Sequence, residues 1–263
     1  MPLTKYPYYL MSGARLLTRV EPARLVLRQF AGTAGPGPHV LTLRGGGPRF
    51  KVRSAMDTWS VKETFLDRLY ERFGFALEPG WNVIDIGAGV GDFTVLAALS
   101  HPTVRVTAFE PAPESFSLLL DNLRLNGVTN AVAFHEAVWV ADGFAVLDTS
   151  GGEPSAYAVR HVPEARCGTR VATVTLETIV GRLRFERVDL VKLDCEGAEY
   201  AILPGTPRSV FEKIDRIVLE YHEGLTGHSH RELAELLERM GYRVETFANY
   251  AREELGYLRA RRT

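Results

Sequence analysis

Three glycines stand at alternate positions directly after a short apolar stretch. Residues 82–86 (Asn-Val-Ile-Asp-Ile) are followed by Gly87, Gly89 and Gly91, and then by Asp92. Glycine has no Cβ, so the backbone of such a turn can approach a ligand closely. A helix that opens near Asp92 would direct its free N–H groups to the same place. The pattern predicts a strand, a turn and a helix that together hold a nucleotide-like cofactor.

An acidic residue, Asp85, lies two positions before the first glycine. A fixed negative charge there would repel the pyrophosphate of a dinucleotide, whereas it would attract the sulfonium and the α-ammonium of S-adenosylmethionine. The dinucleotide fingerprint G-x-G-x-x-G also fails, because its third glycine is replaced by Asp92. We therefore predict a methyl donor in preference to a nicotinamide.

A second acidic residue, Glu110, ends the apolar run 104–109 and is followed by Pro111. An acidic residue about 20 positions after the glycines, at the end of the second strand, is placed to accept both hydroxyls of an adenosine ribose. This feature supports an adenosine ligand without choosing between the two cofactor classes. An ordinary tight turn followed by a solvated glutamate is the simpler alternative, and the occurrence of both features in this order disfavours it.

A second group of ionisable residues follows two later apolar runs. Lys192, Asp194 and Glu196 alternate, so they share one side of an extended chain, and Glu220 and His222 follow another run. If the two strands are neighbours, these groups converge near the methyl group. There they could orient an acceptor hydroxyl, remove its proton or bind a divalent ion such as Mg²⁺.

Each of these residues has a predicted role and a structural alternative. Asp194 is the first choice for a general base or metal ligand, Glu196 and His222 come next, and Lys192 would supply an orienting charge. Alternatively, Lys192 only pairs with Asp194 or Glu220 at the sheet edge, and His222 has only a surface or hydrogen-bonding role. The sequence does not decide whether a metal is used.

Composition narrows the class of protein further. The chain has 263 residues, of which 46% are hydrophobic and 24% charged, as in a globular protein. Its 31 basic and 32 acidic residues give a net charge of -1, which argues against a nucleic-acid partner. The two cysteines lack metal-site spacing and there is no long apolar run, so we expect a reducing, cytoplasmic location without a membrane partner. Self-association into a homo-oligomer stays open.

The elements that must position these residues alternate between strands and helices. The patterns predict an α/β fold with a mostly parallel Rossmann-like sheet, helices on both faces and an antiparallel last strand. Residues 1–54 are expected to form a helical and hairpin appendage to a cofactor-binding domain at 55–263. The expected strands are 39–43, 49–53, 81–86, 104–109, 131–135, 170–175, 188–193, 214–220, 242–247 and 255–259. A helical pattern is expected over 10–30, interrupted at Pro22, and further helices are expected over 59–73, 92–100, 113–126 and 231–240. Residues 138–148 are expected to be hairpin-like, and residues 150–169 to form a loop over the site.

Three motifs carry a resemblance to a known family. They are residues 83–94, Phe109-Glu110-Pro111 with Asn122 and residues 125–127, and residues 189–199, which read D-L-V-K-L-D-C-E-G-A-E. Together they resemble the FkbM family of S-adenosylmethionine-dependent methyltransferases over roughly residues 55–250. The third motif is the specific one, because the glycine turn is shared by nearly all class I methyltransferases. Cys195 stands where the family often has an aliphatic residue.

The resemblance implies a class I methyltransferase fold and O-methylation of a hydroxyl on a small-molecule acceptor, such as a secondary metabolite or a sugar. It implies that Asp85, Gly87 and Gly91 hold the methionine end of the cofactor, Glu110 the ribose, and Glu136 or Ala137 the adenine edge. The remaining expected cofactor-binding residues are Ala88, Gly89, Phe93, Thr94 and Pro111.

Two other functions compete with a small-molecule O-methyltransferase. One is methylation of an RNA or a protein, and the other is a non-catalytic module that binds S-adenosylmethionine as a ligand. The neutral charge weakens an RNA acceptor, and the Lys192, Asp194 and Glu196 cluster favours turnover over a non-catalytic module. Trp59, Trp139 and Tyr157 are candidates for the acceptor pocket wall, and residues 1–54 are a candidate for acceptor choice.

Overall fold

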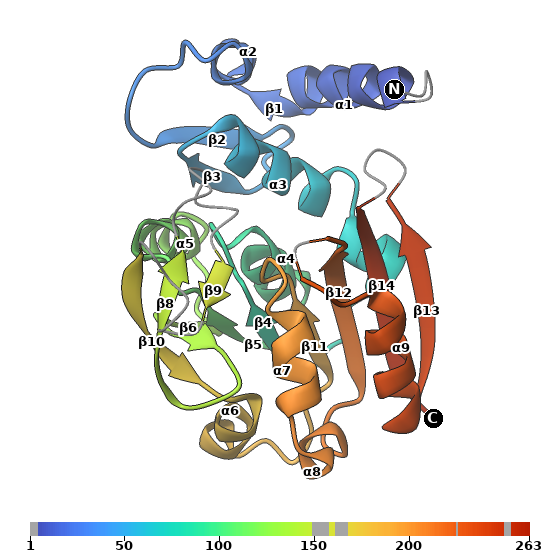
Figure 1. Ribbon diagram of the computed structural model, residues 1–263. Helices are drawn as coiled ribbons and strands as arrows, with labels where there is room; N and C mark the ends of the chain where they lie inside the picture. The colour runs from blue at the N-terminus through green and yellow to red at the C-terminus, as the bar shows by residue number, and fades with distance from the viewer. Residues whose placement is uncertain (1–4, 149–157, 161–167, 225, 250–253) are drawn as a thin grey trace.

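In the computed structural model, a seven-stranded sheet forms the centre of the described part of the chain (Figure 1). The structure describes residues 5–148, 158–160, 168–224, 226–249 and 254–263. The strand order is β13 (Tyr242–Ala248), β14 (Leu255–Arg262), β12 (Arg216–His222), β11 (Leu190–Leu193), β4 (Asn82–Ile86), β5 (Arg105–Phe109) and β6 (Ala131–Phe134).

The strands of this sheet are parallel except around β14, which is antiparallel to both of its neighbours. From β4 the chain proceeds to β5 and β6 on one side and later returns to place β11 on the other side. Such a reversal leaves a crevice at the carboxyl ends of the two central strands. The predicted α/β class and antiparallel last strand are confirmed.

Alternate residues of β4 face opposite layers of helices. Val83 belongs to a hydrophobic cluster with α4 (Asp92–Ser100) and η1 (Tyr70–Gly74), whereas Ile84 and Ile86 belong to the large cluster that includes α6, α7 and α9. These helices span Leu176–Leu183, Glu199–Gly205 and His230–Arg239; α8 (Arg208–Phe211) follows α7. Helix α5 (Pro113–Leu125) connects β5 to β6. Asp85 shares its side of the strand with Val83, so it points toward α4.

A smaller sheet lies between β6 and α6 in the sequence. Its strands are ordered β7 (Ala137–Val138), β10 (Thr169–Val174), β8 (Gly143–Asp148) and β9 (Ala158–Arg160). The prediction of a hairpin over 138–148 was wrong, because β7 and β8 lie on opposite sides of β10 and do not pair with each other. In the predicted loop over 150–169, residues 158–160 form strand β9 against β8, and 149–157 and 161–167 lie outside the described residues.

The N-terminal segment contains two helices and a small sheet. Helices α1 (Lys5–Arg19) and α2 (Ala23–Phe30) flank β1 (Val20–Glu21), which pairs with the predicted hairpin of β2 (His39–Leu43) and β3 (Arg49–Val52). These elements share one hydrophobic cluster with α3, α4 and α5. The division of the chain at residue 54 stays a prediction.

One helix prediction needs correction. Instead of one helix over 59–73, the chain forms α3 (Ala55–Phe65) and the separate π-helical turn η1. Ser54 caps α3 by accepting hydrogen bonds from the N–H groups of Met56 and Asp57. Between α3 and η1, Arg68 has a left-handed backbone with φ of 54°, which a continuous α-helix does not accommodate.

Two asparagines, Asn122 within α5 and Asn126 at its C-terminal end, attach the hairpin of β2 and β3 to the core. The Asn126 side chain bonds the N–H and the carbonyl of Arg49 at 2.8 and 2.7 Å. Asn122 bonds the N–H and the carbonyl of Lys51 at 2.6 and 3.1 Å, and its amide also donates to the carbonyl of Val90 in the glycine turn at 2.8 Å. The hairpin is therefore linked directly to the turn. Among the described residues, no helix is long and apolar enough to cross a membrane.

Candidate active site

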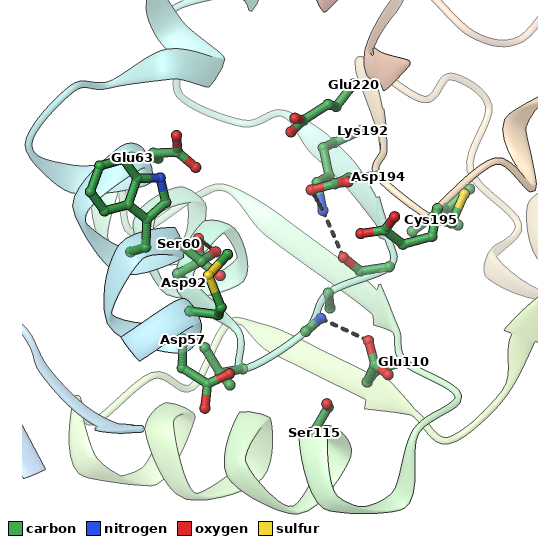
Figure 2. A pocket seen from close by; sticks show the side chains of 18 of the residues that line it. Asp57, Ser60, Glu63, Asp92, Glu110, Ser115, Lys192, Asp194, Cys195 and Glu220 are labelled. Atoms are coloured by element: carbon green, nitrogen blue, oxygen red, sulfur yellow. Dashed lines mark hydrogen bonds and ion pairs between the residues drawn. The ribbon is translucent and has the colours of Figure 1, made fainter. Parts of the chain in front are cut away.

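A cavity of about 410 Å³ lies at the carboxyl ends of the central strands. Its wall includes the glycine turn, the ends of β5, β11 and β12, helix α3 and parts of α1 and α2. Figure 2 shows Glu110, Ser115 and Asp57 at one end of this pocket and Glu63 and Glu220 at the other. Its volume is typical of a small-molecule site.

The three glycines of the predicted turn are required for different structural reasons. All have left-handed backbones, with φ of 72° at Gly87, 55° at Gly89 and 86° at Gly91. A Cβ at Gly87 would lie 1.8 Å from the carbonyl oxygen of Asp194, and one at Gly91 would lie 2.4 Å from Leu119 Cδ1. A Cβ at Gly89 would meet nothing within 4 Å. Gly87 and Gly91 thus permit internal packing, whereas Gly89 faces open space where a ligand could approach.

Glu110 is buried at the wall of the cavity and is held by two backbone amides. The N–H of Gly89 donates to its Oε2 and the N–H of Ala112 to its Oε1, both at 2.8 Å. Burial raises the pKa of Glu110 to about 7, although both amides lower it. Each carboxylate oxygen retains a second lone pair, so the group could accept the two hydroxyls of a ribose.

Asp85, which was predicted to hold the methionine end of the cofactor, does not line the cavity. Its side chain is fully buried, its Oδ2 accepts a 2.6 Å hydrogen bond from Thr94, and its Oδ1 lies 3.1 Å from Lys192 Nζ. The charge is therefore already paired within the protein. The argument that Asp85 attracts the sulfonium directly did not anticipate this partner.

Of the other residues expected to bind the cofactor, some line the cavity and some do not. Gly87, Ala88, Gly89, Pro111 and Ala137 line the cavity. Four others do not line it: Gly91 packs against Leu119, Phe93 is in the core beside Tyr70, Thr94 is buried against Asp85, and Glu136 forms a 2.9 Å ion pair with Arg182. Of the two candidates for the adenine edge, the structure thus places only Ala137 at the cavity.

Asp194 lies at the cavity wall between a phenol and an ammonium group. The hydroxyl of Tyr70 donates to Asp194 Oδ2 at 2.8 Å, and Lys192 Nζ is 3.8 Å from the same oxygen. Burial and the nearby carboxylates raise the pKa of Tyr70 well above its usual value, so the phenol remains a hydrogen-bond donor. Asp194 thus has a fixed orientation and a side chain that is 27% exposed.

Glu196 and His222 also meet at this wall, as predicted from the neighbouring strands. His222 Nε2 lies 3.5 Å from Glu196 Oε2, and both residues line the cavity. Glu199 does not line it; it is buried and accepts a 2.6 Å hydrogen bond from the N–H of Cys195. Within the described ranges, no group of three or more His, Cys, Asp or Glu side chains is arranged to hold a metal ion.

Two acidic residues lie at the other end of the cavity: Glu220 of β12, which was expected to converge on the site, and Glu63 of α3, which was not. Burial raises the pKa of Glu63 to about 7. Burial, followed by the charges of Asp194 and Glu63, raises that of Glu220 well above its usual value. Figure 2 shows their carboxyl groups pointing toward each other. The helical pattern of 59–73 did not indicate Glu63, because Glu63 lies in the polar run Lys62-Glu63-Thr64 between two apolar positions of that pattern.

Aromatic side chains from the N-terminal part of the chain complete the wall. Tyr8, Tyr9 and Phe30 line the cavity, and each of their rings lies within 6.3 Å of the Trp59 ring. Trp59, one of the predicted wall residues, lines the cavity. Trp139 packs against the core instead, and Tyr157 lies outside the described residues. The first two helices, which belong to the segment 1–54 named as a candidate for acceptor choice, thus contribute side chains to the cavity wall.

The sheet order, the glycine turn and the acidic residue after the second strand define a class I, S-adenosylmethionine-dependent methyltransferase. A family model described as the methyltransferase FkbM domain matches residues 85–244, and the chain belongs to this family.

Similar proteins support this assignment. The 31-O-demethyl-FK506 methyltransferase FkbM of Streptomyces tacrolimicus is 29% identical over 259 residues, covering 85% of this chain and 96% of the relative. Methyltransferase sdnD of Sordaria araneosa is 26% identical over 239 residues, covering 76% of this chain and 88% of the relative. Among solved structures, a putative rRNA methylase from Clostridium thermocellum has a TM-score of 0.50 at 10% identity, covering 74% of this chain and 94% of that chain. That likeness concerns the fold alone.

Proposed function

We propose that this methyltransferase transfers a methyl group to a hydroxyl of a small molecule. The observation that supports this most directly is the position of Asp194, a partly exposed carboxylate with a fixed orientation, in the same cavity as Glu110. One cavity thus contains a group suited to bind a ribose and a group suited to accept a proton. The similarity to a methyltransferase named for 31-O-demethyl-FK506 supports an oxygen acceptor on a small molecule.

The cavity fits the cofactor on two independent observations. The carboxylate of Glu110 keeps unused lone pairs at the wall, and the backbone of Gly89 faces open space. When bound, S-adenosylmethionine supplies an electrophilic methyl group on a cationic sulfur. The chain's own contribution is to bind the ribose through Glu110 and to orient the acceptor.

Asp194 is the proposed proton acceptor. An alcohol is a weak nucleophile at neutral pH, so a base near its oxygen helps the transfer. Tyr70 holds one oxygen of Asp194, which leaves the other oxygen available to an acceptor hydroxyl. The pair of His222 and Glu196 is the second candidate for this role. Trp59 and its aromatic neighbours would exclude water from the acceptor end.

The competing functions are less well supported. An RNA acceptor needs a basic surface that leads to the site, whereas the groups around this cavity are largely acidic and the net charge is -1. A protein acceptor would need a side chain that reaches the buried end of the cavity. A non-catalytic module would not need the Tyr70 and Asp194 arrangement.

The first experiment is calorimetric titration with S-adenosylmethionine, S-adenosylhomocysteine and NAD, with and without Mg²⁺. We expect micromolar binding of the first two and none of NAD. Screening of hydroxylated small molecules for methyl transfer follows, with RNA and protein acceptors in parallel. Transfer to RNA or protein alone, or to a nitrogen or carbon atom of the small molecules, would overturn the proposal.

Variants then test the proton acceptor. Asp194→Asn should lower kcat by about 100-fold, within the usual range for loss of a general base, and should leave binding of S-adenosylhomocysteine nearly unchanged. Asp189→Asn is a matched control, because Asp189 precedes β11 and does not line the cavity. If Asp194→Asn keeps full activity and His222→Gln does not, the base is His222.

A further inference from the structure

Lys192 is a buried cation in the centre of the site. Its side chain is 3% exposed, and its Nζ donates a 2.7 Å hydrogen bond to the carbonyl oxygen of Gly87. The same Nζ lies 3.1 Å from Asp85 Oδ1 and 3.8 Å from Asp194 Oδ2. One ammonium group therefore contacts strand β4, the first residue of the glycine turn and the acidic residue that follows β11.

These contacts leave little room for independent movement. Lys192 is paired with Asp85 across the parallel strands β11 and β4. Beyond the strands, a Cβ on Gly87 would lie 1.8 Å from the Asp194 carbonyl, so the two chain segments are in tight contact there as well. A shift of the Gly87 peptide would therefore disturb Asp194, and Lys192 contacts both.

The titratable groups around Lys192 come from every element packed against it. Burial lowers the pKa of Lys192, but the nearby carboxylates outweigh this effect and raise it above its usual value. The ammonium therefore remains charged. The groups that face it are Asp85 of β4, Asp92 of α4, Glu110 after β5, Asp194 after β11, Glu220 of β12 and Tyr70 of η1.

We propose that Lys192 is a positioning residue that couples the two ends of the site. Through Gly87 it holds the glycine turn in the geometry that binds the cofactor, and through its charge it holds the carboxylate of Asp194 at the acceptor end. The assignment of the acceptor end rests on the proposed function, whereas the effect on cofactor affinity does not. The simpler alternative is that Lys192 only neutralises the buried charge of Asp85.

A charge-balanced double variant separates these two roles. Lys192→Met alone leaves Asp85 buried without its partner, so it should lower both the melting temperature and the affinity for S-adenosylhomocysteine. Asp85→Asn combined with Lys192→Met removes the uncompensated charge. We expect this pair to recover most of the melting temperature but to bind S-adenosylhomocysteine at least 10-fold more weakly than the wild type. Recovery of wild-type affinity would overturn the proposal.

Two further measurements complete the test. Lys213→Met changes an exposed lysine and should leave both properties unchanged. In the wild-type protein, the ¹⁵N resonance of the Lys192 ammonium should shift when S-adenosylhomocysteine is added. Lys62→Met identifies the signal of Lys62, which is also buried. This readout does not depend on the folding of any Lys192 variant, and an unmoved resonance would contradict the coupling.

The two proposals can fail separately. Absence of methyl transfer to any hydroxylated acceptor would count against O-methylation and would leave the affinities for S-adenosylhomocysteine unaffected. Unchanged affinity in the double variant would count against coupling through Lys192, whatever the acceptor proves to be.

Discussion

Gly89 and Glu110, which are 21 residues apart in the sequence, are joined by a 2.8 Å hydrogen bond from the Gly89 N–H to the Glu110 carboxylate. This bond joins the glycine turn to the end of β5 within the protein itself. Binding groups that the protein holds in place require less ordering on binding, so more of the interaction energy appears as affinity. Removal of this bond should consequently affect affinity more than folding.

Glu110→Gln tests this relationship. A glutamine offers one acceptor oxygen, so it cannot satisfy the N–H groups of both Gly89 and Ala112, and its NH₂ group would oppose one of them. We expect affinity for S-adenosylhomocysteine to fall at least 10-fold, or about 1.4 kcal/mol, by calorimetry. Glu114→Gln, at an exposed position of α5, is the matched control and should bind normally.

The glycines should respond differently to alanine. Gly87→Ala would place a methyl group against the Asp194 carbonyl, so we expect a loss of several kcal/mol of stability or failure to fold. Gly89→Ala meets no neighbour and should lose only about 1 kcal/mol through its left-handed backbone, yet it should bind S-adenosylhomocysteine poorly. Thermal unfolding and calorimetry measure the two effects; equal destabilisation of both variants would contradict the distinction.

Stability should decrease as the pH rises from about 4.5 to about 7. Burial raises the pKa of Glu110 from 4.5 to about 7, so in this interval the native state binds more protons than the unfolded state. The free energy of unfolding therefore falls with increasing pH. Urea unfolding at pH 5 and pH 8 should show a smaller difference for Glu110→Gln than for the wild type. Part of the pH dependence of the free energy of unfolding should remain in this variant, because the pKa of Glu63 is also raised to about 7.

Lys62 should be important for the attachment of α1. Its side chain is fully buried, its Nζ lies 2.6 Å from Asp67 Oδ2 and 3.3 Å from the hydroxyl of Tyr8, and it stands 4.0 Å over the ring of Trp59. Lys62→Met should cost on the order of 3 kcal/mol and increase proteolysis of the N-terminal segment. Arg44→Met, in an exposed 3.9 Å pair with Glu21, should have little effect on either measurement.

Local patterns were sufficient to predict the glycine turn, the positions of most strands along the chain, and Glu110 and Asp194 at the carboxyl ends of strands. They did not reveal the partner of Asp85, because Lys192 is far away in the sequence and is brought close only by the pairing of β4 with β11. Tyr70 was missed for the same reason: it is 124 residues from Asp194. The aromatic wall depends on how α1 and α2 pack on α3, which no local periodicity encodes.

Asn122 and Asn126 have a consequence for self-association. Strand β3 pairs with β2 along one edge. Along its other edge, the N–H and carbonyl groups of Arg49 and Lys51 form hydrogen bonds with the two asparagine side chains. An open strand edge is a template on which another chain can add a strand. Because these two side chains substitute for that neighbouring strand, this edge is protected from edge-to-edge aggregation.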